Sequence, residues 1–126
     1  MAGASQVFDC GICSYANQIK ERVLGVSHET LEALGTVSRE TAAQMAAGVR
    51  KLAQADIGVS TTGIAGPDGG TDEKPVGLVY VGVDSENYST VLECRLSRGY
   101  RDERELIRYL ASSHALRLAL TAARKA

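Results

Sequence analysis

The chain has 126 residues, enough for a single hydrophobic core, and we predict that residues 1–126 form one domain. Its 44% hydrophobic and 23% charged content is typical of globular proteins. A net charge of −1 and the absence of Trp argue against a nucleic-acid partner, and no apolar run is long enough to span a bilayer. The first residues do not resemble a signal peptide, so we expect a cytoplasmic protein that binds neither nucleic acid nor membrane.

The first half of the chain is predicted to form one strand, over residues 6–14, and three helices. Asn17 is the expected cap of the first helix, which stops at Gly25. Ser27 starts a second, short helix, and Ser38 caps the third. Apolar side chains recur along the third helix at three- and four-residue spacing and form one stripe: Ala42, Met45, Ala46, Val49, Leu52 and Ala53.

The second half is predicted to hold strands over residues 57–62, 76–84 and 89–97, followed by a long helix. The second of these strands is nearly apolar throughout, which is typical of burial on both faces. The last helix carries a buried stripe of Leu106, Ile107, Leu110, Ala111, Ala115, Leu118 and Ala122. This order of elements favours an α/β domain with helices on both sides of a mixed sheet.

The motif CGIC, from Cys10 to Cys13, is open to three interpretations. A C-x-x-C pair before a helix is found in thioredoxin-like redox sites and in zinc sites. A zinc site needs two more ligands, and only Cys94, His28 and His114 remain, without paired spacing. A redox site needs its first cysteine at a helix N-terminus, and the expected cap, Asn17, lies seven residues past Cys10. In a strand the two cysteines would also point to opposite faces, so we favour core packing and rank a small redox protein below it.

The segment YANQIK, residues 15–20, follows the first predicted strand and opens a helix. Ligands of open α/β sheets bind beyond the carboxyl ends of strands, where helix N-termini attract anions. Lys20 lies in the first turn, an unfavourable place for a cation, and a desolvated amine there would have a lowered pKa and could act as a general base. The pattern alone favours the alternative, a solvated lysine on a polar helix face.

The stretch TTGIAGPDGGTDEKPVG, residues 61–77, connects two predicted strands and holds five of the thirteen glycines. Such glycines permit positive φ and a close approach to a ligand, and successive N–H groups in a loop of this kind can bind an anion. The loop lacks the G-K-[ST] of a P-loop. It is either a mobile surface connection or a ligand loop facing the same crevice as residues 15–20, with a phosphate or nucleotide as its guest.

Arginines cluster near the start of the last helix, where Arg104 and Arg108 are four residues apart and share a face. They could clamp a phosphate or a carboxylate. The alternative is a set of surface ion pairs with the neighbouring acids Asp102, Glu103 and Glu105.

These motifs together resemble a known bacterial family. TGIAGPDGGTDEKPVG is similar to the T-G-I-A-G-P-G-G-G-T-x-x-K-P-V-G of the CinA C-terminal domain, the nicotinamide mononucleotide (NMN) amidohydrolase family. YANQIKERVLGVS, SRETAAQMAAGVRK and DERELIR also resemble motifs of that family. The resemblance runs over nearly the whole chain and implies a three-layer α/β/α fold with a mixed sheet.

The resemblance further implies hydrolysis of NMN to nicotinate mononucleotide and ammonia, in pyridine-nucleotide salvage, by a serine nucleophile and a lysine base without metal or cofactor. It makes Lys20 the base and Tyr15 the second catalytic residue, which would shape the site. The residues that it implies for binding a mononucleotide are Asn17, Thr62, Gly63, Gly66, Gly70, Thr71 and Arg104.

Two departures qualify this expectation. The serine of the family lies in an upstream A-E-S-x-T-G-G segment that is absent from these 126 residues, and Asp68 stands where the family usually has glycine. We therefore expect a fold that is incomplete at the N-terminus and an activity that is impaired in this chain alone. The alternative is a non-catalytic nucleotide-binding or oligomerisation module. A sheet that lacks one strand also predicts a homo-oligomer.

Overall fold

The structure is a computed structural model that describes all 126 residues. Its elements in chain order are a 3-10 turn η1 (Ala4–Gln6), helices α1 (Asn17–Arg22), α2 (His28–Leu34) and α3 (Arg39–Ala53), strands β1 (Ile57–Gly63), β2 (Leu78–Ser85) and β3 (Ser89–Arg95), and helix α4 (Arg104–Arg124).

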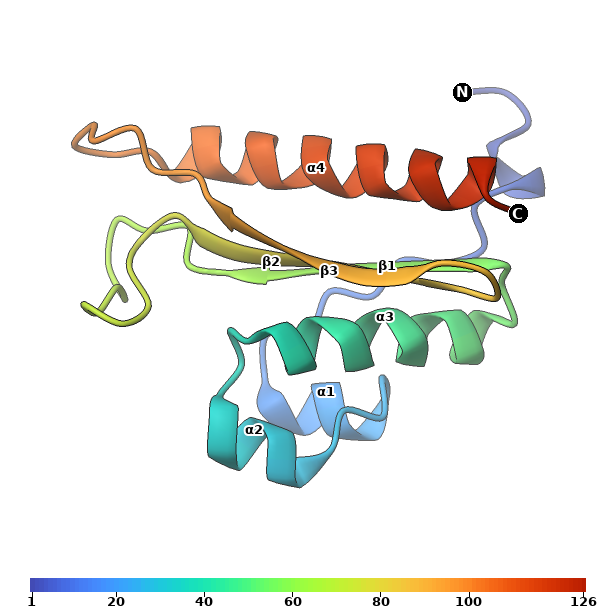
Figure 1. Cartoon of the computed structure of the whole chain (residues 1–126), viewed down its shortest axis with the longest axis horizontal. Helices are drawn as coiled ribbons and strands as arrows, with labels where there is room; N and C mark the ends of the chain where they lie inside the picture. Colours follow the sequence, from blue (N-terminus) through green and yellow to red (C-terminus); the bar gives the residue numbers. More distant parts are fainter.

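The sheet lies between two helical layers (Figure 1). Helix α4 covers one face, α3 covers the other, and α1 and α2 lie on the far side of α3. The strand order is β1-β2-β3, so the nearly apolar β2 is the central strand. The expected three-layer α/β/α fold class is confirmed.

The sheet itself differs from the expected mixed sheet, because both pairings, β1 with β2 and β2 with β3, are antiparallel. The predicted strand over residues 6–14 is also wrong: residues 8–15 form neither helix nor strand. A strand requires a neighbour with which to exchange hydrogen bonds, and none of the backbone–backbone hydrogen bonds uses a group between Asp9 and Tyr15.

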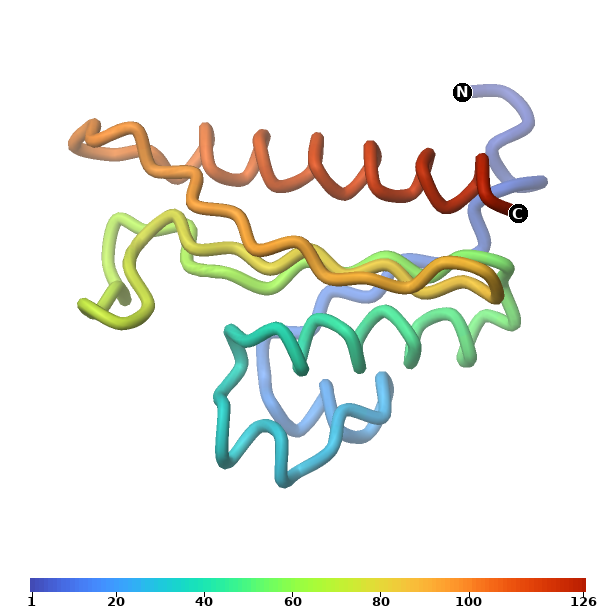
Figure 2. The backbone as a smooth tube through the Cα atoms, viewed as in Figure 1, coloured from blue at the N-terminus to red at the C-terminus, as the bar shows by residue number.

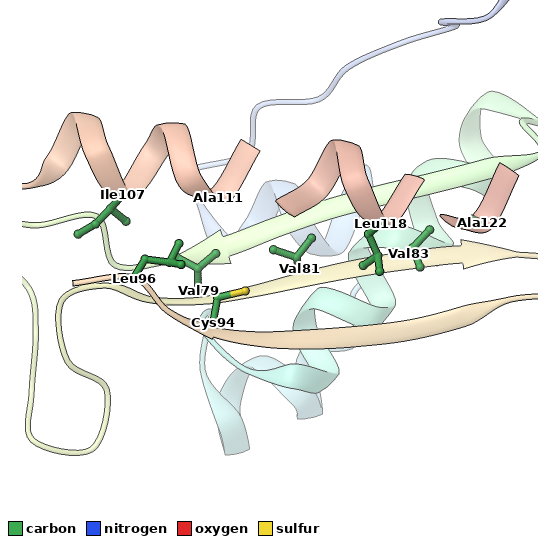
Figure 3. Close-up of a cluster of buried hydrophobic side chains, with 9 residues drawn as sticks. All are labelled: Val79, Val81, Val83, Cys94, Leu96, Ile107, Ala111, Leu118 and Ala122. Atoms are coloured by element: carbon green, nitrogen blue, oxygen red, sulfur yellow. The ribbon is translucent and has the colours of Figure 1, made fainter. Parts of the chain in front are cut away.

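The larger hydrophobic core lies between the sheet and α4 (Figure 3). Its members come from β2, β3, the segment just after β3, and α4: Val79, Val81, Val83, Cys94, Leu96, Ile107, Ala111, Leu118 and Ala122. The predicted stripe of the last helix therefore faces the sheet. Cys10 and Cys13, by contrast, are exposed, so their predicted place in the core is wrong.

The helix starts follow the caps read from the sequence in two of three cases. The hydroxyls of Ser27 and Ser38 accept hydrogen bonds from backbone N–H groups three residues later, as N-caps do. Asn17 is not a cap but the first residue of α1, and its side chain bonds elsewhere. In α3 the predicted stripe is buried at Ala42, Met45 and Ala46, whereas Leu52 is exposed.

Helix α3 makes a very close contact with the connection that leaves α1. A Cβ built on Gly48 would lie 1.7 Å from the carbonyl oxygen of Leu24, which is far below any van der Waals distance. Leu24 is itself buried in a smaller core cluster with Val26, Leu31 and Met45. A glycine is therefore required at position 48 for α1 to pack against α3.

We expect Gly48→Ala to lower the free energy of unfolding by about 2 kcal/mol or more, although alanine is the better helix former, because the added methyl overpacks a backbone contact. Urea unfolding monitored by circular dichroism measures the change. Ala47→Gly, at the neighbouring exposed position, is the control and should cost only about 1 kcal/mol through helix propensity. A stabilised Gly48→Ala variant would contradict this packing.

Candidate functional site

Lys20 is buried in the fourth position of α1, with only 3% of its surface exposed. Its Nζ donates a hydrogen bond of 2.7 Å to the carbonyl oxygen of Ser14, and none of the four ion pairs of the structure includes it. The interpretation of Lys20 as a solvated surface lysine is therefore wrong. A buried amine without a carboxylate partner is an unusual group in a small domain.

Burial lowers the pKa of Lys20 below the usual lysine value, and the negative charge of a Cys13 thiolate acts in the opposite direction. The neutral amine is the form that can accept a proton from a reacting group. The Oγ of Ser14 is buried near Lys20 without any hydrogen-bond partner. A partly satisfied lysine beside an unsatisfied hydroxyl is typical of a functional site rather than of a stability-optimised core.

Asn17 and Thr62 are joined through Thr36, which lies in the linker between α2 and α3. The Thr36 hydroxyl donates to Asn17 Oδ1 at 2.6 Å, and the Thr36 carbonyl accepts from Thr62 Oγ1 at 2.7 Å. One residue thus ties the start of α1 to the end of β1. The sequence analysis missed Thr36, because it belongs to no motif and its role depends on two segments distant in sequence.

Tyr15 does not join this group. Its side chain is 85% exposed and makes no hydrogen bond, although Tyr15 directly follows the Ser14 that holds Lys20. No contact in this structure therefore supports its predicted role beside Lys20.

The glycine loop between β1 and β2 is compact at its base. Gly66 has φ of +77°, and a Cβ there would lie 2.6 Å from the side chain of Val76. A Cβ on Gly70 would lie 2.7 Å from the backbone nitrogen of Val76. Thr71 and Lys74 exchange two hydrogen bonds, of 2.9 and 3.0 Å, that close a turn at its tip.

The loop borders a shallow, open hollow of about 430 Å³. The residues that line it are Pro67, Asp68, Gly69, Gly70, Thr71, Asp72, Pro75 and Val76. Two of them carry carboxylates and none carries a cation. Any anionic group bound here would therefore depend on backbone N–H groups and on cations that do not line the hollow.

Two cations that do not line the hollow anchor the loop to other parts of the chain. Arg104, at the start of α4, donates from its guanidinium to the carbonyl of Gly66 at 2.8 Å, and Lys74 Nζ donates to the carbonyl of Leu34 at 2.5 Å. The alternative in which Arg104 pairs with neighbouring surface acids is wrong, since no ion pair includes it. The loop and the segment that leads to α4 project beyond the same end of the sheet (Figure 2).

The predicted site residues therefore form two connected groups. Asn17 and Thr62 meet through Thr36, and Gly66 meets Arg104. Gly63 is the last residue of β1, and a Cβ there would lie 2.8 Å from the carbonyl of Leu78, so the pairing with β2 leaves no room for a side chain. No hydrogen bond joins Lys20 directly to the loop; the connection runs through α1, Thr36 and β1.

No cluster of three or more His, Cys, Asp or Glu side chains is placed to hold a metal ion. None of the helices combines the length and apolar character needed to cross a bilayer.

Residues 1–123 match the family described as the CinA C-terminal domain. The chain belongs to this family. The resemblance drawn from its motifs is thereby confirmed. A relative in Thermoanaerobacter pseudethanolicus, whose name describes a competence-damage inducible protein, is 53% identical over 116 residues, which is 92% of this chain and 27% of the relative. A CinA-like protein of Desulfovibrio desulfuricans is 51% identical over 114 residues, or 90% of this chain and 27% of the relative.

The fold also agrees with solved structures of the CinA superfamily. The competence/damage inducible protein CihA of Agrobacterium tumefaciens superposes with a TM-score of 0.90 at 41% identity, covering 97% of this chain and 73% of that protein. A CinA superfamily protein of Enterobacter cloacae gives a TM-score of 0.82 at 29% identity, covering 96% and 70%. This chain thus spans about a quarter of the length of the curated CinA relatives and most of the solved CinA domains.

The burial of Lys20 predicts a pH dependence of stability. The amine of Lys20 binds its proton less tightly in the folded chain than in the unfolded chain. The contribution of Lys20 to the free energy of unfolding therefore increases as the pH rises toward 10.5, the usual lysine pKa. We expect wild type to become more stable relative to Lys20→Met over this rise. Urea unfolding at neutral pH and at several alkaline values measures the difference, and a difference that is constant with pH would contradict the burial of a charged amine.

The bond from Arg104 to Gly66 predicts a local effect. Arg104→Ala should speed amide hydrogen exchange in the glycine loop, while the free energy of unfolding falls by only about 1 kcal/mol, since one hydrogen bond is lost. Arg108→Ala is the matched control, because Arg108 is exposed one turn further along α4 and makes no hydrogen bond. Equal exchange in both variants would show that Arg104 does not hold the loop.

Proposed function

We propose that this CinA domain forms the nucleotide-binding and base-bearing part of an NMN amidohydrolase site. The observation that carries the proposal is Lys20: a buried amine with a lowered pKa and no carboxylate partner, one turn from the Asn17–Thr36–Thr62 connection that leads to the glycine loop. The names of the CinA relatives and structures state no substrate, so NMN enters through the family resemblance of the motifs.

In the proposed reaction the carboxamide of NMN is hydrolysed to nicotinate mononucleotide and ammonia. The neutral amine of Lys20 would take the proton of an attacking hydroxyl, which is a weak nucleophile until a base activates it. Backbone N–H groups at the loop would stabilise the negative charge that develops on the carbonyl oxygen. No serine hydroxyl lies within hydrogen-bond distance of Lys20 Nζ, whose one partner is the Ser14 carbonyl.

That last observation limits the proposed activity of this chain. The A-E-S-x-T-G-G segment, which carries the family's serine, does not occur in the 126 residues. We therefore propose that the chain binds the mononucleotide but hydrolyses it poorly alone. The same observation favours the second candidate, a nucleotide-binding module without catalysis, and the two differ in whether residual turnover depends on Lys20.

The phosphate of NMN would meet Arg104 at the edge of the loop. One nitrogen of its guanidinium is bonded to the Gly66 carbonyl, and an arginine has five N–H donors in a fixed plane. The remaining donors can bind a phosphate while the first keeps the loop in place. Asp68 and Asp72, which line the hollow, would repel a phosphate placed inside it, so the phosphate is expected at Arg104, outside the hollow.

Calorimetry with NMN and an ammonia-release assay on the purified chain test this function. We expect NMN binding that Arg104→Ala weakens by about tenfold, or roughly 1.4 kcal/mol. Lys51→Ala, on the exposed face of α3, is the control for a change of charge and should leave binding unaltered.

The outcomes of these two assays distinguish the impaired amidohydrolase from the binding module. Weak ammonia release that Lys20→Ala abolishes supports an impaired amidohydrolase, and binding without any release supports the binding module. Rapid release by wild type that is lost in Lys20→Ala would require another nucleophile and contradict the impairment. Absence of NMN binding would contradict the site itself.

A further inference from the structure

The Cys10–Cys13 pair is a sequence motif that the proposed nucleotide site does not use. Both thiols are free and exposed, whereas Cys94 is buried in the core against α4. One objection to a redox role was a strand that would point the two side chains to opposite faces, and it no longer holds because residues 8–15 form no strand. The other objection stands, since α1 begins at Asn17 and neither cysteine lies at a helix N-terminus. What remains is the exposure and the spacing of the two thiols.

The segment that carries the two thiols is held by the packing of Ile12 and by the bond from Lys20 to the Ser14 carbonyl, but not by pairing of its backbone. It makes no backbone–backbone hydrogen bond between Asp9 and Tyr15. Gly11 lies between the cysteines, and a Cβ there would meet only the Phe8 ring, at an ordinary contact distance of 3.4 Å. The segment can therefore bend at Gly11 without breaking a hydrogen bond of its own backbone.

The spacing of the cysteines suits such a bend. In a β-turn the Cα atoms of the first and fourth residues lie within about 7 Å, and disulfides join residues whose Cα atoms are about 4.4–6.8 Å apart. Cys10 and Cys13 are the first and fourth residues of a turn centred on Gly11 and Ile12. Closing this turn places the two sulfurs in bonding range.

We propose that Cys10 and Cys13 form a redox-active dithiol that a low-molecular-weight disulfide closes to an intramolecular disulfide. One cysteine thiolate attacks a sulfur of the oxidant, whose S–S bond breaks and whose other half leaves as a thiol. The second cysteine attacks the mixed disulfide, forms the Cys10–Cys13 bond and releases the second thiol. Two protein thiols are oxidised, the oxidant is reduced by two electrons, and the cysteine protons pass to the released thiols.

Closure of the turn acts on Lys20. Ser14 directly follows Cys13, and its carbonyl is the one hydrogen-bond acceptor of Lys20 Nζ, at 2.7 Å. Ile12, in the middle of the turn, packs against the smaller core cluster beside α1. Bending the chain here moves both Ile12 and the Ser14 carbonyl, so the oxidised form holds the Lys20 amine differently from the reduced form. This inference does not depend on the identity of the nucleotide.

The experiment uses the full reduced chain in buffers of graded ratios of oxidised to reduced glutathione, followed by alkylation and peptide mass spectrometry. We expect Cys10 and Cys13 to lose alkylation together and to regain it when reduced glutathione is restored. Cys10→Ser and Cys13→Ser should each abolish the intramolecular bond. Cys94→Ala is the matched control and should retain it, because Cys94 lies in the core.

A second measurement tests the link to Lys20. Trace acetylation should change the labelling of Lys20, relative to the exposed Lys51, by at least severalfold between the reduced and oxidised chain. An unchanged ratio would overturn the link. A stable glutathione adduct on one cysteine, a disulfide between two chains, or no oxidation at any ratio would each overturn the dithiol.

Discussion

Helix α3 is held close to its neighbours on two sides through glycines, and the rest of the domain depends on this spacing. Toward the sheet, a Cβ on Gly58 would lie 2.1 Å from the Ala46 carbonyl. On its other side, Gly48 admits the Leu24 carbonyl just as closely. Backbone thus packs directly on backbone, which leaves no room for even a methyl group. The distance from α1 to the sheet is fixed by these contacts rather than by large side chains.

The packing of α3 determines the geometry of the candidate site. Lys20 lies on α1, Thr62 lies near the end of β1, and Thr36 lies in the linker that leads into α3, so α3 sets the separation of all three. A cap at Ser38 fixes where this helix begins and thereby where Thr36 sits. Lys20 and the start of the glycine loop are therefore positioned by one element that contributes residues to neither.

The features that the sequence predicted are those with a local cause. The caps at Ser27 and Ser38, the apolar β2 and the stripe of α4 each carry their signal within one segment, and the structure has them. The burial of Lys20 was not evident from its polar neighbours, because it follows from how α1 packs. Likewise the partner of Arg104 is 38 residues away in sequence, beyond the reach of any helix-face pattern.

The prediction of a strand over residues 6–14 was wrong for the same reason, because strand formation depends on segments that are distant in sequence. The composition of these residues suits a strand, but strand formation depends on a neighbouring chain segment, and no periodicity within nine residues reports whether that neighbour is present. Burial of the two cysteines was inferred from this strand and was wrong with it. The family motif for the glycine loop predicted the loop as a unit, but the two bonds that anchor it arise only in three dimensions.

The two hydrogen bonds that anchor the glycine loop lower the entropic cost that a ligand would meet on binding. A free loop of this length samples many backbone states, and ordering it on binding costs conformational entropy that subtracts from affinity. The bonds from Arg104 to Gly66 and from Lys74 to Leu34 already fix the loop near its start and near its end. A guest that meets this loop encounters a preorganised surface, so its contacts contribute to affinity with little loss to ordering.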